Sequence, residues 1–346
     1  MNSHDLDLLE LETQQRLDDG VFPLIVNGEH LGVNDNEGES DAAADAAHAS
    51  ARVAARVASW VEPRRAELDR LLSRHGAVLF RGFPLATVED FDAFILAFDY
   101  PNFRYRDSLS NAVRVNRTER VFTANEAPPD VEIYMHHEMA QTPVYPSRLF
   151  FFCELPADEA GATPVCRSDL LWQRIKDELP EFAAAAEARG LLYTNVMPDS
   201  DDAGSGQGRS WRSTFFADTR GEAEARMKTL GYSWEWMPDG SLRATTPTLP
   251  AVRTLDDGRQ VFFNQLIAGF RGWKDARNDP SKAITFGDAA PLDRDAVHRL
   301  CDIADELTFD IPWRQGDVVL VDNYLVMHGR RPYRGKRKVL ASLVAA

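Results

Sequence analysis

Short apolar runs with strand-like patterns occur along most of the chain, and helical patterns lie between them. Hydrophobic positions predict strands at 22–26, 77–82, 148–153, 191–196, 261–264, 317–322, 324–327 and 337–345. Apolar residues at helical spacing predict helices at 51–60, 63–74, 168–179, 180–189, 222–230 and 293–307. Another helix is predicted to begin at Thr87, where Thr-Val-Glu-Asp forms a capping box before Phe91, Phe94 and Phe98.

The order of these elements indicates one mixed α+β domain. Strands lie towards both ends of the chain, so the sheet core is closed by pairing between distant segments. Residues from about 166 to 258 carry several helices and a hairpin signal, Pro-Asp-Gly-Ser at 238–241, and form an insertion across that core. The sequence shows no internal repeat and no clean linker.

Charge divides the chain unevenly. The 346 residues have a net charge of −15, and residues 1–50 alone contain twelve acidic residues and one basic residue. We therefore expect an acidic, partly mobile N-terminal segment over 1–60 and a single domain over 61–346. The acidic balance argues against a nucleic-acid partner and against an anionic membrane surface.

The sequence also bears on location. It has no uninterrupted apolar stretch of about 18 residues, so no transmembrane helix is predicted. The start of the chain lacks a basic region followed by an apolar core, so no signal peptide is expected. Cys153, Cys166 and Cys301 are widely spaced and form no CxxC pair, which favours a reducing, cytoplasmic location.

Three residues form a candidate metal site. His136 and Glu138 follow a β-like run, and His328 follows a second strand. Two imidazoles and one carboxylate suit a non-haem iron(II) ion and leave coordination positions open. Residues two apart on a strand face the same side, which selects His136 rather than His137. The alternative is that these are hydrogen-bonded structural residues, because a single His-x-Glu also occurs without a metal.

Several motifs resemble the TauD/TfdA family of iron(II)/2-oxoglutarate dioxygenases, and within it the clavaminate synthase-like proteins. The similar segments cover about 70–345. They include His136-His137-Glu138-Met139-Ala140 and the residues after it, Gly161-Ala-Thr-Pro-Val, Trp313-Arg-Gln-Gly-Asp-Val-Val-Leu-Val-Asp-Asn, and His328-Gly-Arg-Arg-Pro-Tyr. Further similar runs begin at Phe122, Gly208 and Gly272.

The resemblance implies a double-stranded β-helix (jelly-roll) core with flanking helices. It implies that His136, Glu138 and His328 bind Fe(II), with 2-oxoglutarate and O2 as co-substrates and succinate and CO2 as products. We assign the far carboxylate of 2-oxoglutarate to Arg337 and Thr163, because a guanidinium can hold a carboxylate with two hydrogen bonds. Arg334 or Lys338 could replace Arg337, and Thr163 could instead be a turn hydroxyl.

The substrate is expected to be a small polar or amino-acid-like metabolite. Candidate substrate residues from the family-like segments are Asn125, Trp211, Arg212, Asn264 and Arg330. Core packing would also explain Trp211, and a backbone cap would explain Asn264. Because related halogenases have a small residue in place of the carboxylate, the resemblance favours hydroxylation over halogenation, although desaturation, epoxidation and cyclisation remain open. The alternatives are a cupin-type metalloenzyme that does not use 2-oxoglutarate and a non-catalytic metal-binding regulator.

Overall fold

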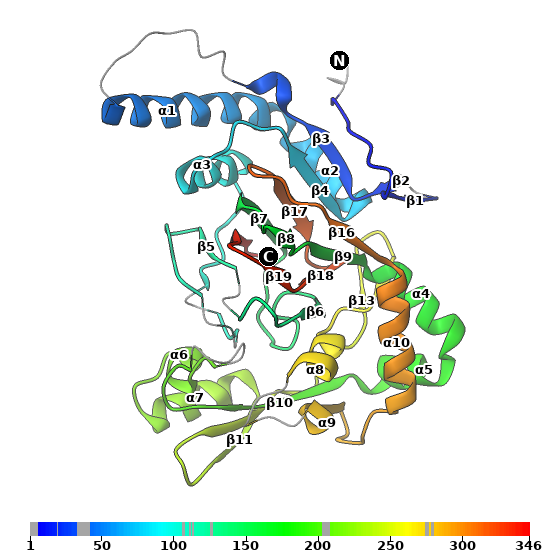
Figure 1. The fold of residues 1–346 in the computed structure, drawn as a ribbon. Helices are drawn as coiled ribbons and strands as arrows, with labels where there is room; N and C mark the ends of the chain where they lie inside the picture. The colour runs from blue at the N-terminus through cyan, green and yellow to red at the C-terminus, as the bar shows by residue number, and fades with distance from the viewer. Residues whose placement is uncertain are drawn as a thin grey trace.

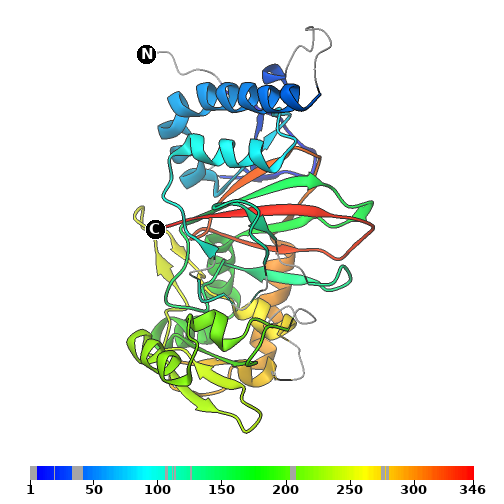
Figure 2. The ribbon, with the colours of Figure 1, turned by 90° about the vertical axis from the view of Figure 1, so that its left-hand side faces the viewer.

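The computed structural model describes residues 6–18, 20–32, 42–105, 108–110, 112, 114–124, 127–202, 208–273, 277 and 280–346. Three layers are visible in Figure 1: helices at the top, two β-sheets in the middle, and a mixed layer of helices and strands below. Figure 2 shows the same stacking from the side. Among the described residues, no helix is both long and apolar enough to cross a membrane.

Two sheets form the middle layer of the described structure. The larger has the order β3 (Leu24–Asn27), β4 (Ala77–Arg81), β17 (Val318–Asp322), β7 (Arg148–Leu155), β20 (Lys338–Val344) and β5 (Phe122–Thr123). The smaller has the order β16 (Thr308–Ile311), β9 (Thr163–Arg167), β18 (Val326–Arg330) and β6 (Ile133–His136). All of these pairings are antiparallel except that of β3 with β4.

The two sheets pack face to face. Leu79 and Phe151 of the larger sheet share one buried cluster with Val165 and Ile311 of the smaller sheet. Side chains alternate along each strand, so Phe150 and Phe152 point to the opposite face of the larger sheet. Both sheets are mainly antiparallel, and many of their paired strands are far apart in the sequence. This agrees with the predicted α+β class. The jelly-roll assignment of this core remains a prediction.

The upper layer covers the outer face of the larger sheet. It consists of α1 (Ala42–Val61), α2 (Arg65–His75) and α3 (Val88–Phe98), which bury Val57, Leu68 and Phe94 in one cluster with Phe80 and Phe152. The capping box predicted at Thr87 is present, with Asp90 as its second residue. The N-terminal region contributes the short pair β1 (Gln15–Leu17) and β2 (Gly20–Phe22), and the buried edge strand β3.

The lower layer is built from the chain between β9 and β16. Its sheet has the order β11 (Ser233–Trp236), β12 (Leu242–Thr245), β10 (Leu191–Met197) and β15 (Ile284–Phe286) among the described residues. Its helices are α4 (Ser168–Glu178), α5 (Pro180–Arg189), α6 (Trp211–Phe215), α7 (Arg220–Leu230), α8 (Leu266–Gly272), α9 (Pro280–Ala283) and α10 (Arg294–Glu306). Since β15 pairs with β10, this layer extends beyond residue 258.

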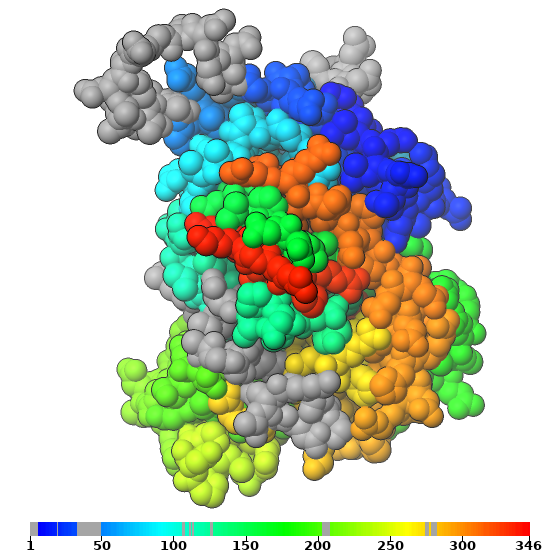
Figure 3. Space-filling view, in the orientation of Figure 1, coloured from blue at the N-terminus to red at the C-terminus, as the bar shows by residue number. Residues whose placement is uncertain are grey.

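Most predicted elements occur close to their predicted positions, including the hairpin of β11 and β12. The strand predicted at 261–264 differs most: β14 (Gln260–Val261) ends before Phe262 and, among the described residues, pairs with β13 (Arg253–Thr254) alone. A last small pair joins β8 (Glu159–Ala160) to β19 (Tyr333–Arg334). In the space-filling view, the C-terminal segment in red crosses the middle of the visible face, with orange residues above it and beside it (Figure 3).

Candidate metal centre and its two cavities

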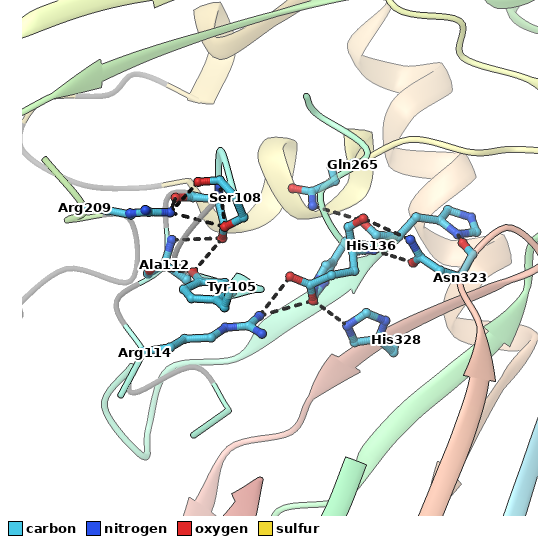
Figure 4. Close-up of polar contacts among 12 residues, drawn as sticks. Tyr105, Ser108, Ala112, Arg114, His136, Arg209, Gln265, Asn323 and His328 are labelled. Carbon is cyan, nitrogen blue, oxygen red and sulfur yellow. Dashed lines mark hydrogen bonds and ion pairs between the residues drawn. The ribbon is translucent and has the colours of Figure 1, made fainter. Parts of the chain in front are cut away.

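His136 and His328 lie directly opposite each other on neighbouring strands. They are register partners in the antiparallel pair of β6 and β18, and their ring centroids are 4.3 Å apart. The ladder becomes irregular between His328 and Arg330. The sheet therefore brings together two imidazoles from distant parts of the chain, as Figure 4 shows.

Glu138 completes the cluster, but not through strand geometry. Strand β6 ends at His136, and Glu138 lies in the turn that follows, so the two-residue alternation used in the sequence analysis does not apply to it. Asn323 fixes this turn instead. Its Oδ1 accepts a hydrogen bond from the Glu138 backbone N–H at 2.7 Å, and its Nδ2 donates to the Glu138 carbonyl at 3.0 Å.

The three side chains converge on one point. One potential ligand atom from each of His136, Glu138 and His328 lies within 4.8 Å of the other two. His328 Nε2 is 3.4 Å from Glu138 Oε2, and both side chains are about 95 % buried. His137, by contrast, turns away: its Nδ1 donates to the Asn323 carbonyl at 2.5 Å, and its ring packs on Phe263.

The electrostatics leave Glu138 and His136 in the protonation states that metal ligands need. Burial alone would raise the pKa of Glu138, but the charge of Arg114 and the hydrogen bond with His328 outweigh it, so this pKa lies well below its usual range. Burial and the neighbouring His328 lower the pKa of His136 to about 4. A carboxylate faces a neutral imidazole, so neither residue carries a proton that a cation would have to displace.

A hydrogen bond also suits metal binding by His136. His136 Nδ1 lies 2.7 Å from the Tyr134 carbonyl, which is an acceptor only, so Nδ1 carries the proton and Nε2 has a free lone pair. Two imidazole nitrogens and a carboxylate oxygen form a donor set typical of non-haem Fe(II) sites. The residues present therefore fit the metal that the sequence predicts.

A cation belonging to the protein already contacts this cluster. Arg114 Nη2 lies 3.0 and 3.2 Å from the two carboxylate oxygens of Glu138, as the dashed lines in Figure 4 show. Its guanidinium lies over the rings of Tyr105 and Phe122, and its side chain is only 7 % exposed. Its Nε and Nη1 are buried and have no partner among the described residues. The guanidinium therefore retains hydrogen-bonding capacity for a further anion.

One cavity runs from the two histidines to Arg337. Its wall includes His136, His328, Thr163, Arg330 and Arg337. Among the described residues, no carboxylate pairs with Arg337; its Nε donates to the Gly161 carbonyl and its Nη2 to Thr163 Oγ1. Burial, with Arg330 nearby, lowers the pKa of Arg337 to about 10. A buried guanidinium of this kind is suited to binding an anion.

Thr163 is arranged to donate a hydrogen bond into the same cavity. Its Oγ1 accepts from Trp313 Nε1 at 2.9 Å and from Arg337 Nη2 at 3.3 Å. A hydroxyl accepts two hydrogen bonds and donates one, so the proton of Thr163 remains available. Thr163 and Arg337 together therefore offer a hydroxyl donor and a cation to one carboxylate.

The alternative cations at this position face solvent. The side chain of Arg334 is 83 % exposed and lies 3.4 Å from Glu159. The side chain of Lys338 is 58 % exposed and lies 3.9 Å from Glu154. Neither lines the cavity, so the geometry favours Arg337.

A second cavity opens on the other side of His136. Its wall includes Glu138, Gln141, Gln265 and Trp273, and it shares His136, Ile133 and Arg114 with the first cavity. Gln265 is held in place because its Nε2 donates to the His137 carbonyl at 2.9 Å. The side chains of the triad thus line two adjoining cavities, each of which reaches Arg114.

The predicted substrate residues are dispersed. Arg330 lines the Arg337 cavity and donates to the carbonyls of Ala127, Pro128 and Val131. Arg212 borders an outer hollow that also contains Arg114, and it forms an ion pair with Asp199 at 2.9 Å. Asn125 lies outside the described residues.

Two other predicted substrate residues belong to the core. Trp211 is fully buried among the side chains of α7 and β12 and donates from Nε1 to the Gly240 carbonyl. Asn264 donates to the Ala251 carbonyl and accepts from the Leu266 N–H, so its amide is a backbone cap. Neither residue lines either cavity that adjoins the triad.

Sequence reasoning assigned no role to Arg114, Gln141, Gln265 or Asn323. Asn323 ends the run Trp313–Asn323, which was recognised as family-like, so its place in that motif was a usable signal. Gln141 lies in the family-like run that begins at His136, so it carried the same kind of signal. Arg114 and Gln265 carried none, because only the folded chain brings them to the triad.

The chain is similar to known dioxygenases. A sequence model described as taurine catabolism dioxygenase TauD, TfdA family, matches residues 44–343. A clavaminate synthase-like protein of Arabidopsis thaliana is 44 % identical over 284 residues, 82 % of this chain and 86 % of the relative. The dapdiamide synthesis protein DdaC of Enterobacter agglomerans is 26 % identical over 80 % of this chain and 84 % of that protein.

A solved structure shares the fold. It is a Burkholderia xenovorans protein of the alpha-ketoglutarate-dependent taurine dioxygenase type, with a TM-score of 0.51 and 12 % sequence identity. The alignment covers 99 % of this chain and 93 % of that protein.

Proposed function

The chain belongs to the TauD/TfdA dioxygenase family, and from this we propose that it is an Fe(II)- and 2-oxoglutarate-dependent dioxygenase. We propose that it hydroxylates a small polar or amino-acid-like metabolite and releases succinate and CO2. The observation that supports this best is the continuity between the His136–Glu138–His328 cluster and a cavity that ends at Thr163 and Arg337.

Each residue has a proposed role. His136, Glu138 and His328 would hold Fe(II), which when bound supplies the redox chemistry that couples O2 reduction to the decarboxylation of 2-oxoglutarate. Arg337 and Thr163 would bind the far carboxylate of 2-oxoglutarate. This places the other end of the co-substrate towards the histidines, because both lie on the wall of the same cavity.

The second cavity is the proposed substrate site. Arg114 lies on its wall with two unpartnered guanidinium nitrogens, which suits the carboxylate of an amino-acid-like substrate. The name of one relative, a dapdiamide synthesis protein, also points to the metabolism of small molecules. The walls of this cavity would hold the reacting carbon close to the metal.

The test is an anaerobic titration of the metal-free protein with Fe(II) and then with 2-oxoglutarate, followed by visible spectroscopy. A metal-to-ligand charge-transfer band is expected in the wild type. It should be lost in Glu138→Ala and need more 2-oxoglutarate in Arg337→Met. Arg334→Met, which alters an exposed neighbour, is the matched control. Bound iron without any band would favour the cupin-type or the non-catalytic alternative.

A further inference from the structure

Beyond the second cavity, a third cavity lies inside the lower layer. It shares Gln141 and Trp273 with the proposed substrate site and is lined further by β10, β12 and α6. Leu109 lines the third cavity, and its neighbour Ser110 lines the second. The two cavities therefore adjoin each other at Gln141 and Trp273.

Three polar side chains in this wall have atoms without a partner. Both amide atoms of Asn195, Oε1 of Gln141 and Oγ1 of Thr214 are buried, with no hydrogen bond to the described residues. The three residues are 7 %, 7 % and 2 % exposed. Both the oxygen and the nitrogen of the Asn195 amide lack a partner among the described residues. Exchanging their positions would therefore not provide either atom with a hydrogen bond.

Two other polar side chains of the same wall, Thr246 and Tyr193, do have hydrogen-bond partners. Thr246 Oγ1 accepts from the Tyr193 N–H, and the hydroxyl of Tyr193 accepts from the Gln265 N–H. A threonine in a helix often bonds the carbonyl four residues earlier, as Thr229 does with Ala225. Thr214 makes no such side-chain bond, although its backbone N–H bonds Ser210 in the ordinary way.

The cavity is polar but uncharged. Among the described residues that line it, none is acidic or basic; the remaining wall includes Met197, Phe215 and Ala244. An ionised group here would lose its hydration without gaining a counter-charge, which is costly. An uncharged group that both donates and accepts would satisfy Asn195, Gln141 and Thr214 together.

We propose that Asn195, Gln141 and Thr214 form a subsite for an uncharged hydrogen-bonding end group of the substrate, such as a carboxamide or a ureido group. Its assignment to the substrate rests on the proposed function. The substrate would then extend from the triad past Gln141 and Trp273 into the lower layer, and its far end would carry no charge. Leaving these buried groups unpaired would disfavour analogues that lack the end group.

The test uses the full chain and two small probes, propionamide and propionate, which have the same shape but differ in charge. Binding is followed by crystal soaking and by saturation-transfer NMR. Propionamide is expected beside Asn195 in the wild type, and propionate is not. Asn195→Leu and Thr214→Val should each weaken propionamide binding by about tenfold, because each removes hydrogen bonds to an uncharged partner.

Thr194→Val is the matched control. Thr194 is the next residue on β10, and its side chain bonds Thr245 instead. Ordered water alone at Asn195 in the presence of propionamide, or equal binding of propionate, would overturn the proposal. Folding of each variant is checked by circular dichroism, and the Fe(II)·2-oxoglutarate band is recorded separately. If the wild type binds propionamide but gives no band, the subsite is supported and the proposed function is refuted.

Discussion

Arg337 Nη2 donates a hydrogen bond of 3.3 Å to Thr163 Oγ1, although 174 residues separate the two positions. Trp313 donates to the same oxygen from Nε1 at 2.9 Å. The two acceptor positions of the hydroxyl are thus occupied by the protein, and its proton and the guanidinium face one cavity. This pair is the most specific sign in the structure of a dicarboxylate co-substrate.

We predict that Arg337→Met raises the KM for 2-oxoglutarate by about 10–100-fold, because it removes a charge-assisted pair of hydrogen bonds. Arg337→Lys keeps the charge but not the planar fork, and should lie between the wild type and Arg337→Met. The measurement is 2-oxoglutarate consumption at fixed Fe(II). A KM for Arg337→Met equal to that of Arg334→Met would contradict the assignment.

Metal addition should stabilise the protein. Three buried potential ligands converge in the folded state, so Mn(II) or Fe(II) at about 100 times Kd is expected to add about 2.7 kcal/mol to the unfolding free energy. His328→Ala should abolish the rise in Tm, whereas His298→Ala should retain it. Differential scanning fluorimetry with and without a chelator measures both, and an unchanged rise in His328→Ala would exclude this metal site.

Asn323 is predicted to position Glu138 without contacting the metal. Its amide holds the backbone of Glu138 on both sides and also donates to the Pro146 carbonyl at 2.7 Å. Asn323→Ala should weaken Fe(II) binding by about tenfold, as loss of a supporting interaction at a metal site commonly does. Metal affinity by competitive chelation is the measurement. If a folded Asn323→Ala protein bound Fe(II) as tightly as the wild type, the turn at Glu138 would not depend on Asn323.

The buried pair of Arg81 and Asp317 provides a stability prediction. Arg81 Nη2 lies 2.6 Å from Asp317 Oδ2, and the side chains are 3 % and 1 % exposed. Arg81→Met leaves the carboxylate buried without its cation and should cost about 3–5 kcal/mol. Adding Asp317→Leu should recover part of that loss in urea denaturation. If the double variant is no more stable than Arg81→Met, the unpaired charge is not the cause.

The metal-free protein should lose stability as the pH falls below about 6.5. Burial lowers the pKa of His136 to about 4 and that of His137 to about 3, so between these values and about 6.5 the unfolded chain binds more protons than the folded one. Each histidine contributes a slope of up to about 1.4 kcal/mol per pH unit. The slope of unfolding free energy against pH, measured by urea denaturation across this window, should be shallower for His137→Gln than for the wild type. An identical slope would show that His137 does not cause the loss of stability.

Local patterns predicted the elements well where the information is local. The capping box at Thr87 and the apolar spacing after it place α3 correctly. The triad residues were identified through the motif resemblance, but the argument from strand alternation was incomplete. Glu138 lies beyond the end of β6, and Asn323, which arrives from the end of β17, holds it in place.

Contacts made only by the folded chain could not be predicted in this way. Arg114 precedes the triad by 22 positions or more and has no motif of its own, yet it contacts Glu138. Conversely, Trp211 lies in a family-like run but is buried by the packing of α6, α7 and β12. Proximity in such cases depends on which strands pair, and single-residue patterns do not contain that information.

Arg114, Ile133 and His136 line both cavities that adjoin the triad. Through these residues, binding in one cavity could be coupled to binding in the other. A ligand that draws the Arg114 guanidinium towards one cavity changes the field in the other. The affinities of the two ligands are then thermodynamically linked, and by reciprocity each must alter the other by the same factor. If the proposed sites are correct, co-substrate and substrate would each change the affinity for the other through the residues that both cavities share.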